Sequence, residues 1–140
     1  MEFVFKWKDS FCINIEEIDK QHKKLFEIGA RVYDVLSLDD GYDHYDQIIE
    51  IINELKDYTV YHFNYEEELM KKYGYEGLEE QHFQHVFFIK KLERIANKDI
   101  DVHQKDSTVE IMEFLADWIS SHILKSDIKY KDFFVEKGVF

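Results

Sequence analysis

The residues best suited to chemistry are histidines and a glutamate on the inward stripes of four expected helices. His62 and Glu66 lie four residues apart, in an apolar stripe that also contains Ile52 and Leu55. Three other segments place a histidine at an equivalent position: His22, His85 and His122. An unpaired ionised carboxylate in a core is costly, and no Lys or Arg falls at a matching inward position of this segment. Glu66 therefore predicts a metal ion.

The informative feature is that all four segments place a histidine on their inward stripe. A single histidine on a core-facing stripe is more often a hydrogen-bonded core residue than a ligand. Four of them with Glu66 would need five separate sets of polar partners, which the surrounding Ile, Leu, Phe and Tyr residues hardly supply. Imidazole and carboxylate suit iron, manganese or zinc, and four ligands saturate a structural zinc. The five candidates favour two metal ions that share a carboxylate.

Asp127 is a carboxylate that its spacing leaves outside this group. It follows His122 by five residues, which on an unbroken α-helix separates the two side chains by about 140° around the axis. Both could face one site only if the helix ends or distorts between them. On spacing alone, Asp127 is predicted to be a solvated carboxylate at a helix end.

Other candidates are weaker. Four polar residues fall outside the stripes: His44, His103, Glu67 and Glu68. The two histidines are predicted to be solvated in polar connections, and the two glutamates to point off the face of Glu66. Four aromatic residues could wall a ligand cavity, although their helical spacing is more typical of ordinary core: Phe63, Tyr65, Phe88 and Trp118.

The elements that must position these residues are four helices. Apolar periodicity and chain breakers predict them at about residues 18–36, 43–72, 76–97 and 107–125. Short connections make neighbours antiparallel, so we expect one all-α domain over residues 1–140, an up-down-up-down four-helix bundle. An extended N-terminal arm is expected at about 1–17, and residues 128–140 are expected to fold back as a short cap.

Composition limits the possible partners. The 140 residues suffice for one core, and the lack of proline favours long helices. A net charge of −12 repels phosphate backbones and anionic lipids, so nucleic acid and membranes are not expected as partners. Cys12 is the only cysteine, which excludes an internal disulfide and a thiolate-only metal cluster. We expect a cytoplasmic protein that is a monomer or a small homo-oligomer.

Three motifs occur in order along the chain. They are IDKQHKKLF at residues 18–26 after Trp7, HFNYEEELM at residues 62–70, and WISSH at residues 118–122 followed by Asp127. Together they resemble the signatures of the hemerythrin family in its bacterial single-domain form, over nearly the whole chain. Contrary to the spacing argument, this resemblance implies that Asp127 is a metal ligand.

The chain departs from the family pattern at one ligand position. On the third expected helix the family has two histidines four residues apart, whereas this chain has Gln81 at the first position and His85 at the second. His82 lies one residue late and would require the helix to rotate or bulge. Gln81, His82 or water could complete the second metal ion, and these alternatives stay open.

The resemblance implies two iron ions joined by an oxo or hydroxo bridge. Both irons would also share Glu66 and Asp127 as ligands. One iron would be held by His22 and His62 with a free position for O2. The other would take His85, His122 and the uncertain ligand at position 81. The implied function is reversible O2 binding for storage, delivery or sensing, without enzymatic activity.

Two alternatives remain. A di-iron enzyme that activates O2, peroxide or NO is possible because Gln81 would leave the second iron open. A metal-binding bundle without gas chemistry is the other, and it would have a low iron content.

Overall fold

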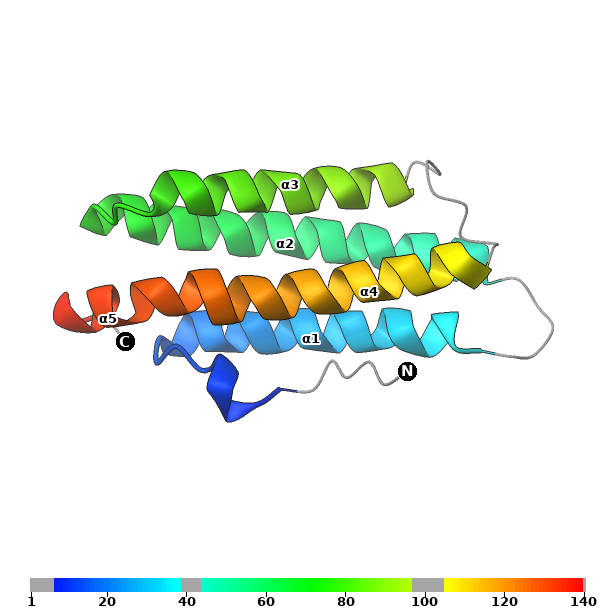
Figure 1. Ribbon diagram of the computed structural model, residues 1–140, viewed down its shortest axis with the longest axis horizontal. Coiled ribbons are helices and arrows are strands. Elements are labelled where there is room, and N and C mark those ends of the chain that lie inside the picture. Colours follow the sequence, from blue (N-terminus) through cyan, green and yellow to red (C-terminus); the bar gives the residue numbers. More distant parts are fainter. Residues whose placement is uncertain (1–6, 39–43, 97–104, 140) are drawn as a thin grey trace.

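The computed structural model describes residues 7–38, 44–96 and 105–139. These contain four long helices: α1 (Glu16–Leu36), α2 (Tyr45–Tyr73), α3 (Leu78–Ala96) and α4 (Lys105–Ser121). The helices lie along the long axis of the molecule and alternate in direction (Figure 1). The predicted all-α, up-down-up-down bundle is therefore confirmed. In the described ranges no helix is both long and apolar enough to cross a membrane.

The ends of the helices follow local chemistry. The first turn of α1 carries Glu16, Glu17 and Asp19, whose charges favour the N-terminal end of the helix dipole. At the other end of α2, Gly74 adopts a left-handed φ of 73°, and the N–H of Tyr75 donates to the carbonyl of Met70 at 2.9 Å. This is the geometry of a glycine helix stop, and it ends α2 at Tyr73, one residue after the predicted end at about residue 72.

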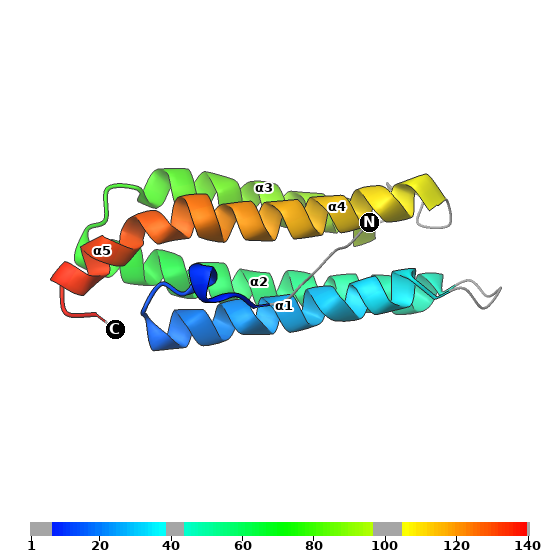
Figure 2. The ribbon, with the colours of Figure 1, turned by 60° about the horizontal axis from the view of Figure 1, so that its bottom comes forward.

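Residues 7–15 lie alongside α1 in both views of the ribbon (Figures 1 and 2). They contain one short 3-10 turn, η1 (Asp9–Phe11), and they bury Phe11, Ile13 and Ile15. The N–H of Ile13 donates to Asp19 Oδ1 at 2.9 Å, which ties this segment to the first turn of α1. Residues 1–6 of the expected arm lie outside the described ranges.

The C-terminal part of the chain differs from the prediction. The chain does not turn back near residue 125; instead α4 passes into a π-helical segment, η2 (His122–Asp127), and then into α5 (Ile128–Glu136). Figure 1 shows α5 at one end of the bundle, continuing from α4. The expected cap is therefore a helix, and Tyr130 and Phe134 on it are completely buried.

Two apolar clusters fill the bundle. The larger one includes Leu25, Leu55, Phe88 and Leu115, one residue from each of the four long helices. The smaller one includes Ile13, Ile18, Met70, Tyr130 and Phe134. Along α1, Leu25 of the larger cluster and Ile18 of the smaller one lie about one turn on either side of His22. A layer of buried polar side chains therefore separates the two clusters.

Candidate metal centre

The polar layer brings together side chains from α1, α2 and α3 and from η2, the segment that follows α4. Its members, each at most 5% exposed, are His22, His62, Glu66, His85, His122 and Asp127. Their possible ligand atoms form two overlapping groups, and within each group all of these atoms lie within 4.8 Å of one another. His22 and His62 belong to the first group and His85 and His122 to the second, whereas Glu66 and Asp127 belong to both. The arrangement offers two adjacent cation positions that share two carboxylates.

Each carboxylate lies between the two groups. Asp127 places Oδ2 3.1 Å from His22 Nε2 and Oδ1 3.1 Å from His122 Nε2. Glu66 places Oε1 2.8 Å from His62 Nε2 and 3.8 Å from His85 Nε2. Asp127 thus offers one oxygen atom to each group.

The π-helical segment explains the position of Asp127. In a π-helix the backbone bonds run from i to i+5, so residues five apart fall on one face. His122 and Asp127 are the first and last residues of η2, and Asp127 is 0% exposed. The prediction of a solvated carboxylate was wrong because it assumed a regular α-helix through residues 122–127.

Hydrogen bonds fix the orientation of three imidazoles. Each donates its Nδ1–H to an oxygen at 2.7 Å: His62 to Gln21 Oε1, His85 to Glu67 Oε2, and His122 to Gln84 Oε1. Because the acceptors place the proton on Nδ1, each Nε2 presents a lone pair to the centre of the layer. Such outer contacts orient histidine ligands in metal sites.

Aromatic rings hold two of these imidazoles in plane. Phe63 stacks on His85 with 3.9 Å between ring centroids and an interplanar angle of 2°. Trp118 stacks on His122 at 4.6 Å and 10°. The rings limit rotation of both imidazoles, so the positions of their Nε2 atoms are set before any ligand binds.

Ligand atoms converge in the layer, and several of them have no partner in the described chain. His85 Nε2 and His122 Nε2 lie 3.1 Å apart, while the Nδ1 of each ring already donates to an acceptor at the edge of the layer. Among the described residues, both ring nitrogens of His22, Glu66 Oε1 and both oxygens of Asp127 have no aligned hydrogen-bond partner. Two ligands about 2.1 Å from one ion and at right angles are about 3.0 Å apart, which is close to the spacing of these atoms. The residues therefore fit a pair of bound cations.

The electrostatics of the carboxylates agree with this fit. Burial and the neighbouring Asp127 both raise the pKa of Glu66, but His62 and His22 outweigh them, and the pKa lies below its ordinary value. Burial also raises the pKa of Asp127, whereas His122 and His22 lower it well below the ordinary value. Both groups are held as carboxylates, the form that binds metal.

The pKa values of the two histidines in the second group shift in opposite directions from the ordinary value. Burial lowers the pKa of His85, and the nearby carboxylates only partly offset this effect, so the ring is held neutral. Burial also disfavours a charged His122, but Asp127 outweighs it and raises the pKa. In the metal-free chain a proton on His122 therefore takes part of the place that a metal cation would fill.

Tyr130 supports the layer from α5. Its hydroxyl donates to Glu66 Oε2, and the pKa of this phenol is well above its ordinary value because of burial and the nearby Asp127 and Glu66. The phenol stays protonated and remains a donor. It fixes the second oxygen of Glu66 while Oε1 faces the histidines.

The acceptors around the layer were missed by the sequence analysis. They are Gln21, Glu67 and Gln84, and Tyr130 was missed as a donor. Glu67 was expected to point off the face of Glu66, but it bridges to α3. Only the position of Gln21, next to His22 in the IDKQH motif, hinted at a role, since contacts between helices leave no periodic signal.

The structure separates the two candidates for the missing ligand. Gln81 is 3% exposed, one turn before His85 on α3, and neither of its amide atoms has a partner among the described residues. The side chain of His82 is 61% exposed, and its Nδ1 donates to Glu67 Oε1 at 2.6 Å. His82 therefore lies outside both groups of candidate ligands.

Of the two weaker histidines, only His44 lies in the described chain, and it does not join the groups. His44 pairs with Gln47 at the start of α2, at 2.9 Å, and His103 lies outside the described residues.

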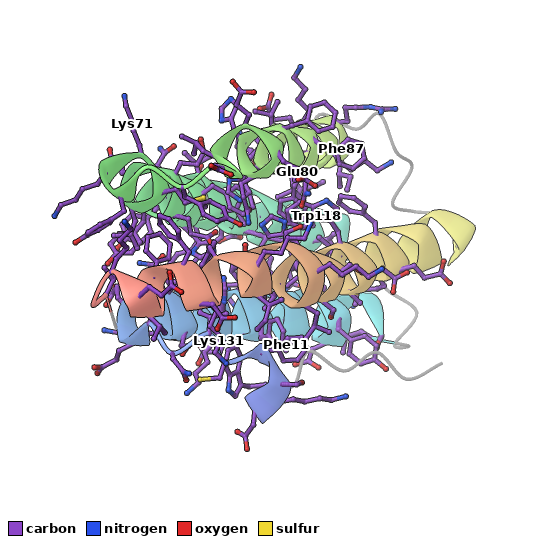
Figure 3. All side chains as sticks on the ribbon, turned by 60° about the vertical axis from the view of Figure 1, so that its left-hand side comes forward. Phe11, Lys71, Glu80, Phe87, Trp118 and Lys131 are labelled. Atoms are coloured by element: carbon purple, nitrogen blue, oxygen red, sulfur yellow. The ribbon has the colours of Figure 1, made fainter. Side chains whose placement is uncertain are left out.

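A small cavity adjoins the polar layer. Its volume is about 10 Å³, of the order needed to admit one water-sized molecule. Besides His22, His62, His122 and Asp127, its wall consists of Leu25, Thr59, Phe63, Phe88, Trp118, Ile119 and Ile123. Figure 3 shows Trp118 on the side of α4 that faces α3. Three of the four candidate aromatic residues thus line a cavity, while Tyr65 packs against the smaller apolar cluster.

Comparisons with known proteins match nearly the whole chain. A family model described as the hemerythrin HHE cation binding domain matches residues 14–133. A bacteriohemerythrin from Clostridium acetobutylicum is 41% identical over 129 residues, which cover 92% of this chain and 100% of that protein. A bacteriohemerythrin from Pseudomonas aeruginosa is 32% identical over 127 residues, covering 90% and 78%. A hemerythrin-like protein from Naegleria gruberi is 28% identical over 130 residues, covering 91% of each chain.

Proposed function

This chain belongs to the hemerythrin family, which binds O2 at a di-iron centre, and we propose that it binds O2 reversibly for storage, delivery or sensing in the cytoplasm. We assign His22 and His62 to one iron and His85 and His122 to the other. Glu66 and Asp127 are the shared carboxylates of this proposal. When bound, the iron pair supplies the electrons and the open coordination position that O2 binding needs.

The observation that carries the assignment is the convergence of ligand atoms in the polar layer. His85 Nε2 and His122 Nε2 face each other at 3.1 Å, and the buried oxygens of Asp127 have no aligned hydrogen-bond partner in the described chain. Without a cation, the Asp127 oxygens would be left unsatisfied, at a cost of about 1–3 kcal/mol for each group. Mixed imidazole and carboxylate ligands suit iron.

The cavity favours binding over further reaction. Its wall, apart from the assigned ligands, is apolar except for Thr59, whose hydroxyl donates to the carbonyl of Lys56 at 2.8 Å. The side chains that form this wall keep water away from the metal position at His22 and His62. They present no acid or base to a diatomic molecule bound there. A dry site of this kind favours release of the unchanged ligand.

The proposal can be tested by loading the protein anaerobically with Fe(II). Iron per chain is counted, O2 is admitted, and the visible spectrum is followed before and after O2 is removed. Two irons per chain and an absorption that disappears and returns with O2 are expected. Irreversible oxidation would contradict reversible binding, and fewer than two irons per chain would contradict the assigned ligand set.

A second candidate function is a di-iron enzyme acting on O2, peroxide or NO. The unpartnered amide of Gln81 favours it, because position 81 supplies no imidazole to the second position. Sustained consumption of an added reductant by the iron-loaded protein would support the enzyme, whereas one oxidation per iron pair without turnover would contradict it.

A further inference from the structure

We propose that the second metal position, at His85 and His122, accepts a water-sized ligand from solvent beside Gln81. The ligand would accept a hydrogen bond from the Gln81 amide, so each half of the centre would have its own place for an exogenous molecule. This inference rests on the di-iron centre proposed above, and it adds a second binding place to that centre.

The two halves of the layer offer equal numbers of metal ligands. Each group in the layer contains two imidazoles and the same two carboxylates. Neither half is richer in ligands, so the described chain gives no reason for only one of them to remain open. His82, the nearest replacement for an imidazole at position 81, is held at the surface by Glu67.

The Gln81 side chain differs from the other glutamines near the layer. Two other glutamines near the layer have both amide atoms engaged. Gln21 accepts from His62 and donates to Glu17 at 3.2 Å, and Gln84 accepts from His122 and donates to Glu80 at 3.5 Å. Gln81 is buried with neither atom engaged in the described chain. A buried amide without partners is unfavourable and calls for a bound molecule.

The position of Gln81 relates it to the second metal position. It precedes His85 by one turn of the regular helix α3, and both residues are buried, so the two side chains share a face. A metal ion next to an amide N–H is a good site for a ligand with a negative or lone-pair-bearing atom, because the hydrogen bond is then assisted by charge.

Solvent reaches this part of the molecule. A surface pocket of about 430 Å³ between α2 and α3 is lined in part by Leu78, His82 and Glu67. Leu78 and His82 lie on either side of Gln81 in the sequence, and Glu67 is the acceptor of His85. The pocket therefore reaches neighbours of both Gln81 and His85, and we infer that a small molecule enters from this side.

The test is an equilibrium titration of the oxidised, iron-loaded protein with azide, a small probe that accepts hydrogen bonds. Iron per chain is measured first, and azide binding is then followed by calorimetry and by absorption. The wild-type chain should bind two azide molecules per iron pair. Gln81→His should hold two irons but bind one azide, because the imidazole occupies the second place.

Two further variants sharpen the result. Gln81→Leu leaves the second metal position open but removes the amide that would donate a hydrogen bond to the ligand. The azide bound at this position should therefore lose affinity by roughly ten- to a hundredfold. Gln47→His adds a histidine at an exposed position on α2 and should leave both azide sites unchanged. Should Gln81→His not fold, the Gln81→Leu titration decides the question alone.

The outcomes distinguish the two proposals. Two irons, reversible O2 binding and a single azide in the wild-type chain would overturn only this inference, because another group would then fill the second place. Two azides in Gln81→His, or unchanged affinities in Gln81→Leu, would also overturn it. Fewer than two irons per wild-type chain would overturn both this inference and the proposed centre.

Discussion

Replacing Gln84 with Leu should weaken metal binding more than it weakens the fold. Gln84 Oε1 accepts two hydrogen bonds at 2.7 Å, one from His122 Nδ1 and one from Ser126 Oγ. Leucine has a similar size but no acceptor, so both donors lose their partner. The proton of His122 is then no longer held on Nδ1, and its Nε2 lone pair is no longer fixed toward the polar layer.

The size of the effect follows from these two bonds. In the metal-free chain, two donors without partners at a half-buried position should lower the free energy of unfolding by about 1–3 kcal/mol. Loss of such an outer contact typically lowers metal affinity by about 10- to 100-fold, which corresponds to about 1.4–2.7 kcal/mol. At saturating metal this second term adds to the first. The loaded variant should therefore lose a further ~4–8 °C in melting temperature.

The assay compares thermal unfolding of the metal-free and metal-loaded proteins, together with the rate of metal loss to a chelator. Ser126→Ala is the matched control, because it removes one donor and leaves the bond from His122 to Gln84 in place. We expect Ser126→Ala to leave metal retention within about threefold of wild type. Equal drops in melting temperature with and without metal for Gln84→Leu would refute the reasoning, since Gln84 would then support only the fold.

Three more predictions concern the ligand layer. Gln81→His should slow iron loss to a chelator; unchanged or faster loss would mean that another group already fills this place. Asp127→Ala should reduce bound iron from two per chain to at most one, because Asp127 offers an oxygen to each group, and retention of two irons would exclude it as a shared ligand. Because Asp127 outweighs burial and raises the pKa of His122, metal must displace a proton there, so affinity should increase from about pH 6 to about pH 8. The raised pKa of His122 stabilises the metal-free fold at low pH. This contribution is lost as the pH rises through the pKa that His122 has in the folded chain. A metal affinity that does not change with pH would contradict this account.

Helical periodicity was sufficient to predict the bundle and most of the buried polar layer. Residues Gln81, His85, Phe88, Leu92 and Ile95 form the buried face of α3 as the spacing predicts. The stripes succeed because a helix of regular pitch turns every third or fourth residue to the core. Element ends were reliable where a specific residue sets them, as Gly74 does for α2.

The errors arose where the backbone leaves the regular pitch or where contacts join two helices. Asp127 was misplaced by spacing because η2 changes the pitch between residues 122 and 127, and only the resemblance to a family supplied its role. The bonds from His85 to Glu67 and from His122 to Gln84 connect different helices. Such pairings depend on how helices are rotated against each other, which no single stripe encodes.

The division of the interior by the polar layer has a consequence for motion. The cluster around Ile18, Met70 and Phe134 and the cluster around Leu55 and Leu92 are separate apolar units, and a bound cation pair would tie α1, α2, α3 and η2 to one another in the layer between them. Removing the metal should let the smaller unit, which includes α5, open on its own. Backbone amides there would then exchange with deuterium sooner than those of the larger unit.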